Sequence, residues 1–236
     1  MAAQQKETPF KGSAKELAEH LRRLKDLRGA GSARPVRLAE LKRFQSQRLA
    51  RSYQDLASQP RYRAATAFFL DDIYGPKDFS ARDQEMLRIL PVMCRILPAS
   101  AVETAALAIE LEALSEDLDH RLAAALPEGS LDDAAYAKAY RESSRRDERI
   151  RQIDLIEAVG RRLDALVKKP LVSQMLKLMR RPAHMAGMGD LQDFLEQGFA
   201  SFREMKGADE FLATLRSREE KILSRLFSGA PEPFSI

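Results

Sequence analysis

Apolar residues recur every three or four positions along most of the chain, which is the spacing of an α-helix with one buried face. The clearest examples lie near the C-terminal end and are Leu191, Phe194, Leu195, Phe199 and Phe202, then Phe211, Leu212, Leu215, Ile222, Leu226 and Phe227. No segment alternates apolar and polar residues with an enrichment of β-branched side chains, so we expect essentially no β-sheet. The pattern predicts an all-α fold, an irregular multi-helix bundle of about eight to ten helices.

Capping and helix-breaking residues divide this pattern into expected helices. Ser13 and Glu16 have capping-box spacing, so the first helix is predicted from there to about Arg28. Others are predicted at about 35–56, 61–74, 80–98 with a bend or break at Pro91, 99–126, and 131–168 with a break near 143–144. Pro170 is expected to begin a short helix, and a loop is predicted from Arg181 and Pro182 to Gly189.

One helical domain is expected to include nearly all of these segments. It is predicted to cover residues 13–228, between a mobile tail at 1–12 and a Pro-containing tail at 229–236. Hydrophobic residues make up 44% of the 236 residues and charged residues 31%, which is enough apolar material for a sizeable core.

Charge is unevenly distributed along the chain. The formal net charge of +4 combines +9 in residues 1–63, −8 in residues 64–144 and +3 in residues 145–236. The basic N-terminal part is therefore expected to pair with the acidic middle, within one chain or between subunits, or to contact a polyanion.

Several functional classes are disfavoured by what the sequence lacks. Cys94 is the only cysteine, which excludes an intramolecular disulfide and a cysteine zinc site, and its apolar neighbours predict a buried, inert thiol. No apolar run is long enough to predict a membrane span, and no secretory signal is evident, so a cytoplasmic protein of bacterial type is expected. The common phosphate-loop, dinucleotide, zinc-protease and serine-hydrolase motifs are absent, so nothing identifies an enzyme.

An acidic residue on an apolar helix face is the first candidate for chemistry. Asp72 falls inside the apolar arc of the helix expected at 61–74, close to Tyr74. A carboxylate in that position must be paired, bind a cation or hold a proton. A salt bridge or a capping bond is the favoured interpretation, and a ligand-binding carboxylate is the alternative.

Three further carboxylates lie along the helix expected at 99–126. Glu103, Glu110 and Asp117 are seven residues apart and lie beside a leucine seam. Carboxylates stacked in this way supply ligands in helical di-iron proteins, but the Glu-x-x-His pairs of those sites are missing. Ion pairs with arginines are therefore favoured, and no metal or other cofactor is assigned.

The predicted loop after Pro170 carries the other candidates. Arg181 follows a second arginine, and His184 lies among four methionines and ahead of glycine amides that precede a helix. Such a segment suits an anion or haem pocket, although a loop packed on the bundle through its methionines is the favoured interpretation.

The basic N-terminal helices suggest a test for nucleic-acid binding. Arginines and lysines between Arg22 and Arg51 could face phosphates, but aromatic stacking residues are sparse there. A solvated face or contact with the acidic middle is favoured over nucleic-acid binding.

Two stretches resemble a known family. Residues 68–83, FFLDDIYGPKDFSARD, and residues 191–199, LQDFLEQGF, with Arg218 and Glu219, resemble an uncharacterised family of bacterial all-helical hypothetical proteins. The resemblance covers most of the chain and implies a helical fold but no activity, so no site residue is transferred from it.

These observations favour a non-catalytic binding or scaffold protein that acts through protein–protein contacts, with a homodimer as one possible form. A helical bundle that binds a small ligand or metal in its core, and so could be an enzyme, is the second interpretation. Its candidate residues are Asp72, Tyr74, Glu103, Glu110, Asp117, Arg181 and His184. Nucleic-acid binding through residues 22–51 is the third, and no membrane partner is expected.

Overall fold

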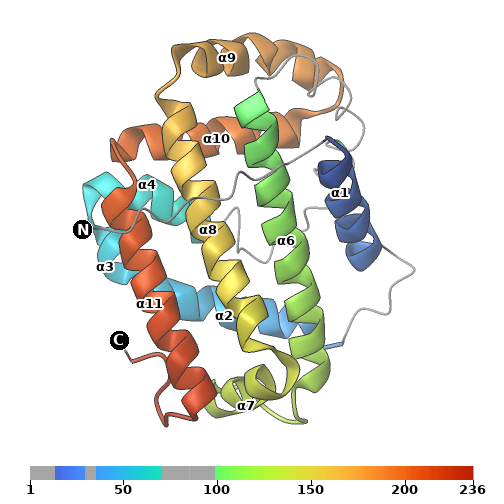
Figure 1. Ribbon diagram of the computed structural model, residues 1–236, viewed down its shortest axis with the longest axis vertical. Coiled ribbons are helices and arrows are strands. Elements are labelled where there is room, and N and C mark those ends of the chain that lie inside the picture. The colour runs from blue at the N-terminus through green and yellow to red at the C-terminus, as the bar shows by residue number, and fades with distance from the viewer. Residues whose placement is uncertain (1–13, 30–35, 71–84, 86–98, 236) are drawn as a thin grey trace, which may run out of the picture.

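The computed structural model describes residues 14–29, 36–70, 85 and 99–235 (Figure 1). Within these residues the chain forms ten helices and no strand, so the predicted all-α multi-helix fold is confirmed. The helices are α1 (Ala14–Arg28), α2 (Leu38–Ser52), α3 (Gln54–Ser58), α4 (Pro60–Phe68), α6 (Ala99–Ala125), α7 (Asp133–Ser143), α8 (Arg146–Val167), α9 (Pro170–Met185), α10 (Gly189–Met205) and α11 (Asp209–Ser228).

Three long helices form the centre of the molecule. Figure 1 shows α6, α8 and α11 side by side along its long axis, with α1 against the outer side of α6 and α2 crossing them. Helices α9 and α10 lie across one end of this group, and α7 lies at the other end. Because α6 has neighbours on several sides, apolar and small residues are buried around most of its circumference.

Apolar side chains from separate parts of the chain meet in the core. One cluster joins Leu41, Leu122, Tyr136 and Ile222, and so links α2, α6, α7 and α11. Another cluster unites α2, α3 and α4 with α10 and α11 around the buried ring of Tyr53. The sequence spacing predicted these apolar faces, and their burial is the main stabilising term of such a bundle.

Two glycines allow helices to approach closely. A Cβ atom added at Gly160 of α8 would lie 2.4 Å from Leu212 Cδ2 of α11. A Cβ atom added at Gly198 of α10 would lie 2.7 Å from Phe68 Cζ of α4. The absence of a side chain at these positions therefore sets the contacts between α8 and α11 and between α10 and α4.

Some predicted boundaries are confirmed and others are corrected. The break near 143–144 is present, since α7 ends at Ser143 and α8 begins at Arg146. The single helix predicted at 35–56 is instead two helices, α2 and α3, which meet at Tyr53. There the backbone leaves helical geometry, with φ −121° and ψ 17°, while the Tyr53 ring remains in the core.

The loop predicted from Arg181 to Gly189 is wrong. Helix α9 continues through Arg181 and Pro182 and ends at Met185. A proline removes one helical hydrogen bond and crowds the preceding turn, which is tolerated near the end of a helix. The last turn still closes, because Ala186 N donates to Pro182 O at 3.0 Å.

Several expectations lie outside the described residues. These are the helix expected at 80–98 apart from Glu85, the candidate residues Asp72 and Tyr74, and the thiol of Cys94. Among the helices that the structure does describe, none combines the length and the apolar character needed to cross a bilayer.

Candidate functional site

Two of the predicted carboxylates on α6 face arginines of α8. Glu103 Oε2 lies 2.7 Å from Arg162 Nη1, and Glu110 Oε1 lies 2.6 Å from Arg151 Nη2. Each of these four side chains is at least partly exposed. An ion pair in contact with water contributes little to stability, typically below about 1 kcal/mol.

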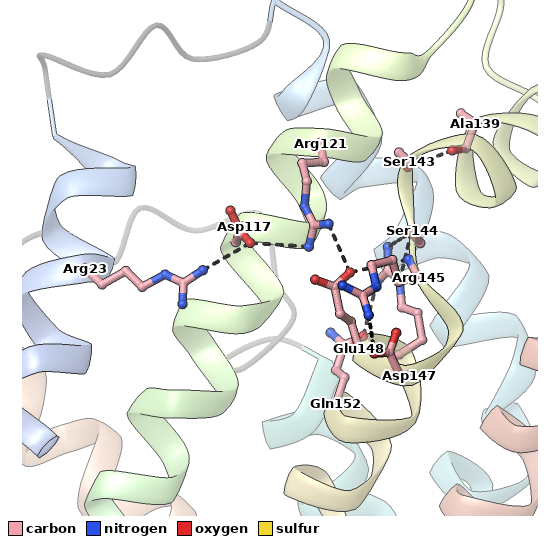
Figure 2. Close-up of polar contacts among 11 residues, drawn as sticks. Arg23, Asp117, Arg121, Ala139, Ser143, Ser144, Arg145, Asp147, Glu148 and Gln152 are labelled. Atoms are coloured by element: carbon pink, nitrogen blue, oxygen red, sulfur yellow. Dashed lines mark hydrogen bonds and ion pairs between the residues drawn. The ribbon is translucent and has the colours of Figure 1, made fainter.

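The third predicted carboxylate, Asp117, belongs to a chain of ion pairs across three helices (Figure 2). Its Oδ2 lies 3.2 Å from Arg23 Nη2 of α1 and 3.3 Å from Arg121 Nη2 on its own helix. Arg121 in turn contacts Glu148 of α8 at 3.0 Å. Glu148 also accepts a hydrogen bond from the backbone N–H of Arg145, as in a capping box, so this chain of charges ends at the start of α8.

The three predicted carboxylates therefore point to different arginines and do not converge on one centre. Among the residues that the structure describes, no group of three or more His, Cys, Asp or Glu is placed to hold a metal ion. The pairing with arginines that the sequence favoured describes the geometry of Glu103, Glu110 and Asp117.

The most buried carboxylate of α6 is one that sequence reasoning missed. Glu116 is 4% exposed and accepts hydrogen bonds from Lys42 Nζ at 2.9 and 3.0 Å and from Arg28 Nε at 3.2 Å. His120 Nε2 lies 3.4 Å from Glu116 Oε1. Burial by itself would raise the pKa of Glu116, but the positive charges of Lys42 and Arg28 outweigh it, and the pKa is lowered.

A second carboxylate, one turn further along α6, has the opposite electrostatic environment. Asp119 Oδ1 accepts a hydrogen bond from Gln45 Nε2 of α2 at 2.9 Å. Burial raises the pKa of Asp119, because Lys42, the Gln45 bond and Arg149 compensate it only in part and Glu116 adds repulsion. Two carboxylates three residues apart are thus driven in opposite directions.

These contacts explain the uneven charge of the sequence. Arg23, Arg28 and Lys42 of the basic N-terminal part pair with Asp117, Glu112 and Glu116 of the acidic middle, all on α6. The Arg28–Glu112 distance is 2.9 Å. Glu112, Glu116 and Asp119 recur with helical spacing, which was the signal in the sequence that could have identified this inner row. The basic residues of α1 and α2 are largely committed within the chain, which weakens the nucleic-acid interpretation.

Helix α9 presents an unusual amount of apolar surface. Leu171 is 58% exposed, Leu178 is 77% exposed and Met185 is 90% exposed. They recur every seven residues, so they form one ridge about 21 Å long at a rise of about 1.5 Å per residue. Ala183 is the only buried residue of α9, which packs on α8 and α10 through its other apolar side. We call the three exposed residues the α9 ridge.

A basic strip lies beside the α9 ridge. Helix α9 contains no acidic residue, and the exposed Lys177 and Arg181 have no carboxylate within ion-pair distance among the described residues. Arg180, by contrast, pairs with Glu196 of α10 at 2.5 Å. The predicted candidate His184 is exposed, and its Nε2 lies 3.2 Å from Asp193 Oδ1 of α10. Arg181 and His184 are therefore surface residues of a helix, well separated along the chain from the carboxylates of α6.

The core interpretation needs a cavity, and the described core offers little room. A pocket between α8 and α11, beside Ile153, Leu212 and Glu219, has a volume of about 10 Å³. That is about the space of one water molecule, whereas sites for small ligands occupy about 300 Å³ or more.

Comparison with known proteins gives a family without an activity. A family model described as a domain of unknown function (DUF8198) matches residues 26–233, and the chain belongs to that family. The resemblance to an uncharacterised helical family is thereby supported for nearly the whole chain. No curated protein and no solved structure matches the chain.

Proposed function

We propose that this member of the DUF8198 family is a non-catalytic binding protein whose α9 ridge docks an acidic amphipathic helix of a partner protein. The observation that carries the proposal is the outward side of α9. Its apolar residues cover more of the helix surface than α8 and α10 bury, and the excess forms the ridge of Leu171, Leu178 and Met185. Contiguous apolar surface rimmed by polar residues is typical of protein interaction sites.

The chemistry of α9 favours one kind of partner. Lys177 and Arg181 lie along one edge of the ridge without acidic neighbours on their own helix, so a partner helix with glutamate or aspartate beside its apolar stripe is complementary. Pairing of α9 with α9 of a second copy would place like charges together, which disfavours a homodimer through this surface. Methionine side chains adapt to partner helices, and α9 has none of the aromatic residues that anchor helices at a bilayer interface.

The ridge alone supports a modest affinity. Complete burial of a Leu or Met side chain is worth about 1.5–3 kcal/mol, so the exposed remainder of three such residues is worth about 4 kcal/mol. That free energy corresponds to a dissociation constant of about 1 mM. Complementary charges at Lys177 and Arg181 and contacts beside α9 must supply the rest, so we expect a transient interface.

The proposal is tested with a designed helical peptide as the probe. The peptide has leucines at heptad spacing flanked by glutamates, and binding to the full chain is measured by fluorescence anisotropy. Leu178→Glu should weaken binding at least tenfold, since it places a charge in the centre of the ridge. Ile150→Glu is the matched control, because Ile150 is an exposed apolar residue of α8, at 40% exposure, and its replacement should leave binding unchanged.

The same peptide with lysines in place of glutamates separates charge complementarity from apolar stickiness. The lysine peptide should bind the wild type poorly and should bind the Lys177→Glu, Arg181→Glu double variant better. Equal binding of both peptides, or equal binding by Leu178→Glu and the wild type, would contradict the proposal. Binding to phosphatidylserine vesicles without binding to the peptide would replace the protein partner with a membrane surface, and a dimer abolished by Leu178→Glu would replace it with a second copy.

A further inference from the structure

A large open cleft lies away from the α9 ridge, between α2–α3, the start of α7, α11 and the C-terminal residues. Its volume is about 1180 Å³. The residues that line it are mostly polar or charged and include Arg51, Asp55, Arg218, Lys221, Asp133 and Phe234. Phe234 is the only aromatic side chain among its described lining residues, and it belongs to the segment that follows α11.

Phe234 is held in an aromatic seat. Its ring centroid lies 5.7 Å from that of Tyr136 of α7 and 6.4 Å from that of Phe44 of α2. The guanidinium carbon of Arg48 lies 5.6 Å from the Phe234 ring centroid, within cation–π distance. Phe44 and Tyr136 also stack on each other at 5.0 Å, so the seat exists independently of the ring that occupies it.

The floor of the seat is held in place by a buried ion pair. Arg48 Nη1 donates to Glu219 Oε1 at 2.7 Å, and the hydroxyl of Tyr53 donates to the same oxygen at 2.7 Å. The buried Nε of Arg48 has no hydrogen-bond partner in the described structure. Arg48 is therefore fixed with its guanidinium against the ring of Phe234, and one of its donors remains unsatisfied there.

The segment that carries Phe234 is attached by few polar contacts. Gly229 ends α11 in a left-handed conformation at φ 73°, which turns the chain back toward the cleft. Arg225 then donates to the carbonyl oxygen of Glu232 at 2.7 and 3.2 Å, and Ala230 N donates to Arg225 O at 3.0 Å. Beyond Pro233, which is buried, the ring of Phe234 supplies the main contact with the rest of the protein.

We propose that this cleft is a peptide-binding site for an extended segment with an aromatic anchor and a nearby acidic residue, and that the chain's own residues 229–235 occupy it as an internal ligand. The segment supplies the pattern, with Glu232 two residues before Phe234 and prolines that reduce the conformational freedom lost on docking. The cleft continues beyond the tail past Arg51 and Lys221, which suit the acidic residues of a longer occupant. This site is separate from the α9 ridge and does not depend on the function proposed for it.

An internal ligand should compete with an external one. A tethered segment acts at an effective concentration of about 1 mM. A free peptide with a dissociation constant of about 0.1 mM for the empty seat would therefore bind the intact chain about tenfold more weakly than a chain whose seat is vacant.

The test uses a fluorescein-labelled peptide with the sequence of residues 229–235, GAPEPFS, and the full chain carrying Phe234→Ala. Fluorescence anisotropy should give about tenfold tighter binding to this variant than to the wild type. A peptide with alanine in place of its phenylalanine should not bind either chain. Phe227→Ala is the matched control, since Phe227 packs on Tyr140 at 5.7 Å outside the cleft and its loss should not create peptide binding.

A second variant guards against misfolding of Phe234→Ala. Arg225→Ala removes the two bonds to the Glu232 carbonyl and leaves every lining residue of the cleft in place, so it should also increase peptide binding. Gain of binding in either folded variant, and not in Phe227→Ala, supports the proposal. Equal peptide binding by the wild type and both variants, or no binding by any of them while circular dichroism shows helical folding, would overturn it.

Discussion

The two inner carboxylates of α6 should respond in opposite directions to the same kind of substitution. Glu116→Gln removes a charge that Lys42 and Arg28 stabilise, whereas Asp119→Asn removes a charge that burial destabilises. Both substitutions keep the side-chain size, and the amide introduced by Asp119→Asn would retain an oxygen to accept the bond from Gln45 Nε2. The chemistry is matched and only the environment differs.

The magnitudes follow from what each change leaves behind. Breaking a buried ion pair costs about 3–5 kcal/mol. Lys42 remains 26% exposed and Arg28 keeps its 2.9 Å contact with Glu112, so Glu116→Gln should cost less, about 2–3 kcal/mol. Asp119→Asn should stabilise the fold by about 1 kcal/mol, the order of the cost of a poorly satisfied buried polar group. In a chain of this size, 1 kcal/mol corresponds to about 2–4 °C in melting temperature.

The pH dependence gives a second, independent check. The folded-state pKa of Glu116 is lowered, so its stabilising contribution is present above the unfolded-state pKa and is lost as the pH falls through the folded-state value. The folded-state pKa of Asp119 is raised, so its destabilising contribution appears as the pH rises from the unfolded-state pKa through the folded-state value. Both differences from the wild type should therefore shrink toward about pH 4.

Urea unfolding followed by circular dichroism at pH 7 and at lower pH measures both effects. Glu142→Gln is the control, because Glu142 is exposed on α7 and its change should stay within about 0.5 kcal/mol. Asp119→Asn destabilising the protein at pH 7 by as much as Glu116→Gln would refute this account of the inner row.

Three further predictions concern packing, backbone conformation and surface charge. Gly160→Ala should destabilise the fold by about 1–3 kcal/mol, because its Cβ would lie 2.4 Å from Leu212, and the double variant with Leu212→Ala should be less destabilised than the sum of the two single variants in urea unfolding. Lys206→Gly should raise the melting temperature by about 2–4 °C, since Lys206 ends α10 at φ 57°, where a side chain costs about 1 kcal/mol, and an unchanged or lower value would contradict this. Glu103→Gln should lower the free energy of unfolding by less than about 1 kcal/mol, because its pair with Arg162 is about one-third exposed, and a larger loss would mean that this carboxylate has a further role.

The candidate sites show where a single helix pattern is sufficient and where it fails. Glu103, Glu110 and Asp117 could be placed on one flank of α6, and pairing with arginines could be expected from the abundance of arginine. The sequence does not contain the information that Arg162, Arg151 and Arg23 are the partners, because that depends on which helices pack against α6. Glu116 was missed for the same reason, since α6 has neighbours on several sides and no single apolar face identifies its interior.

The sequence by itself determined the helical class, the apolar faces of α10 and α11, the break before α8 and the uneven charge. These depend on local periodicity and on the conformational limits of capping and breaking residues, which act within a few positions of the chain. The tertiary structure alone decided that α9 continues through Pro182, that part of its apolar surface stays uncovered, and that Phe234 returns to a seat made by α2 and α7. Burial and pairing of this kind arise between segments distant in sequence, so they exist only once the helices have packed.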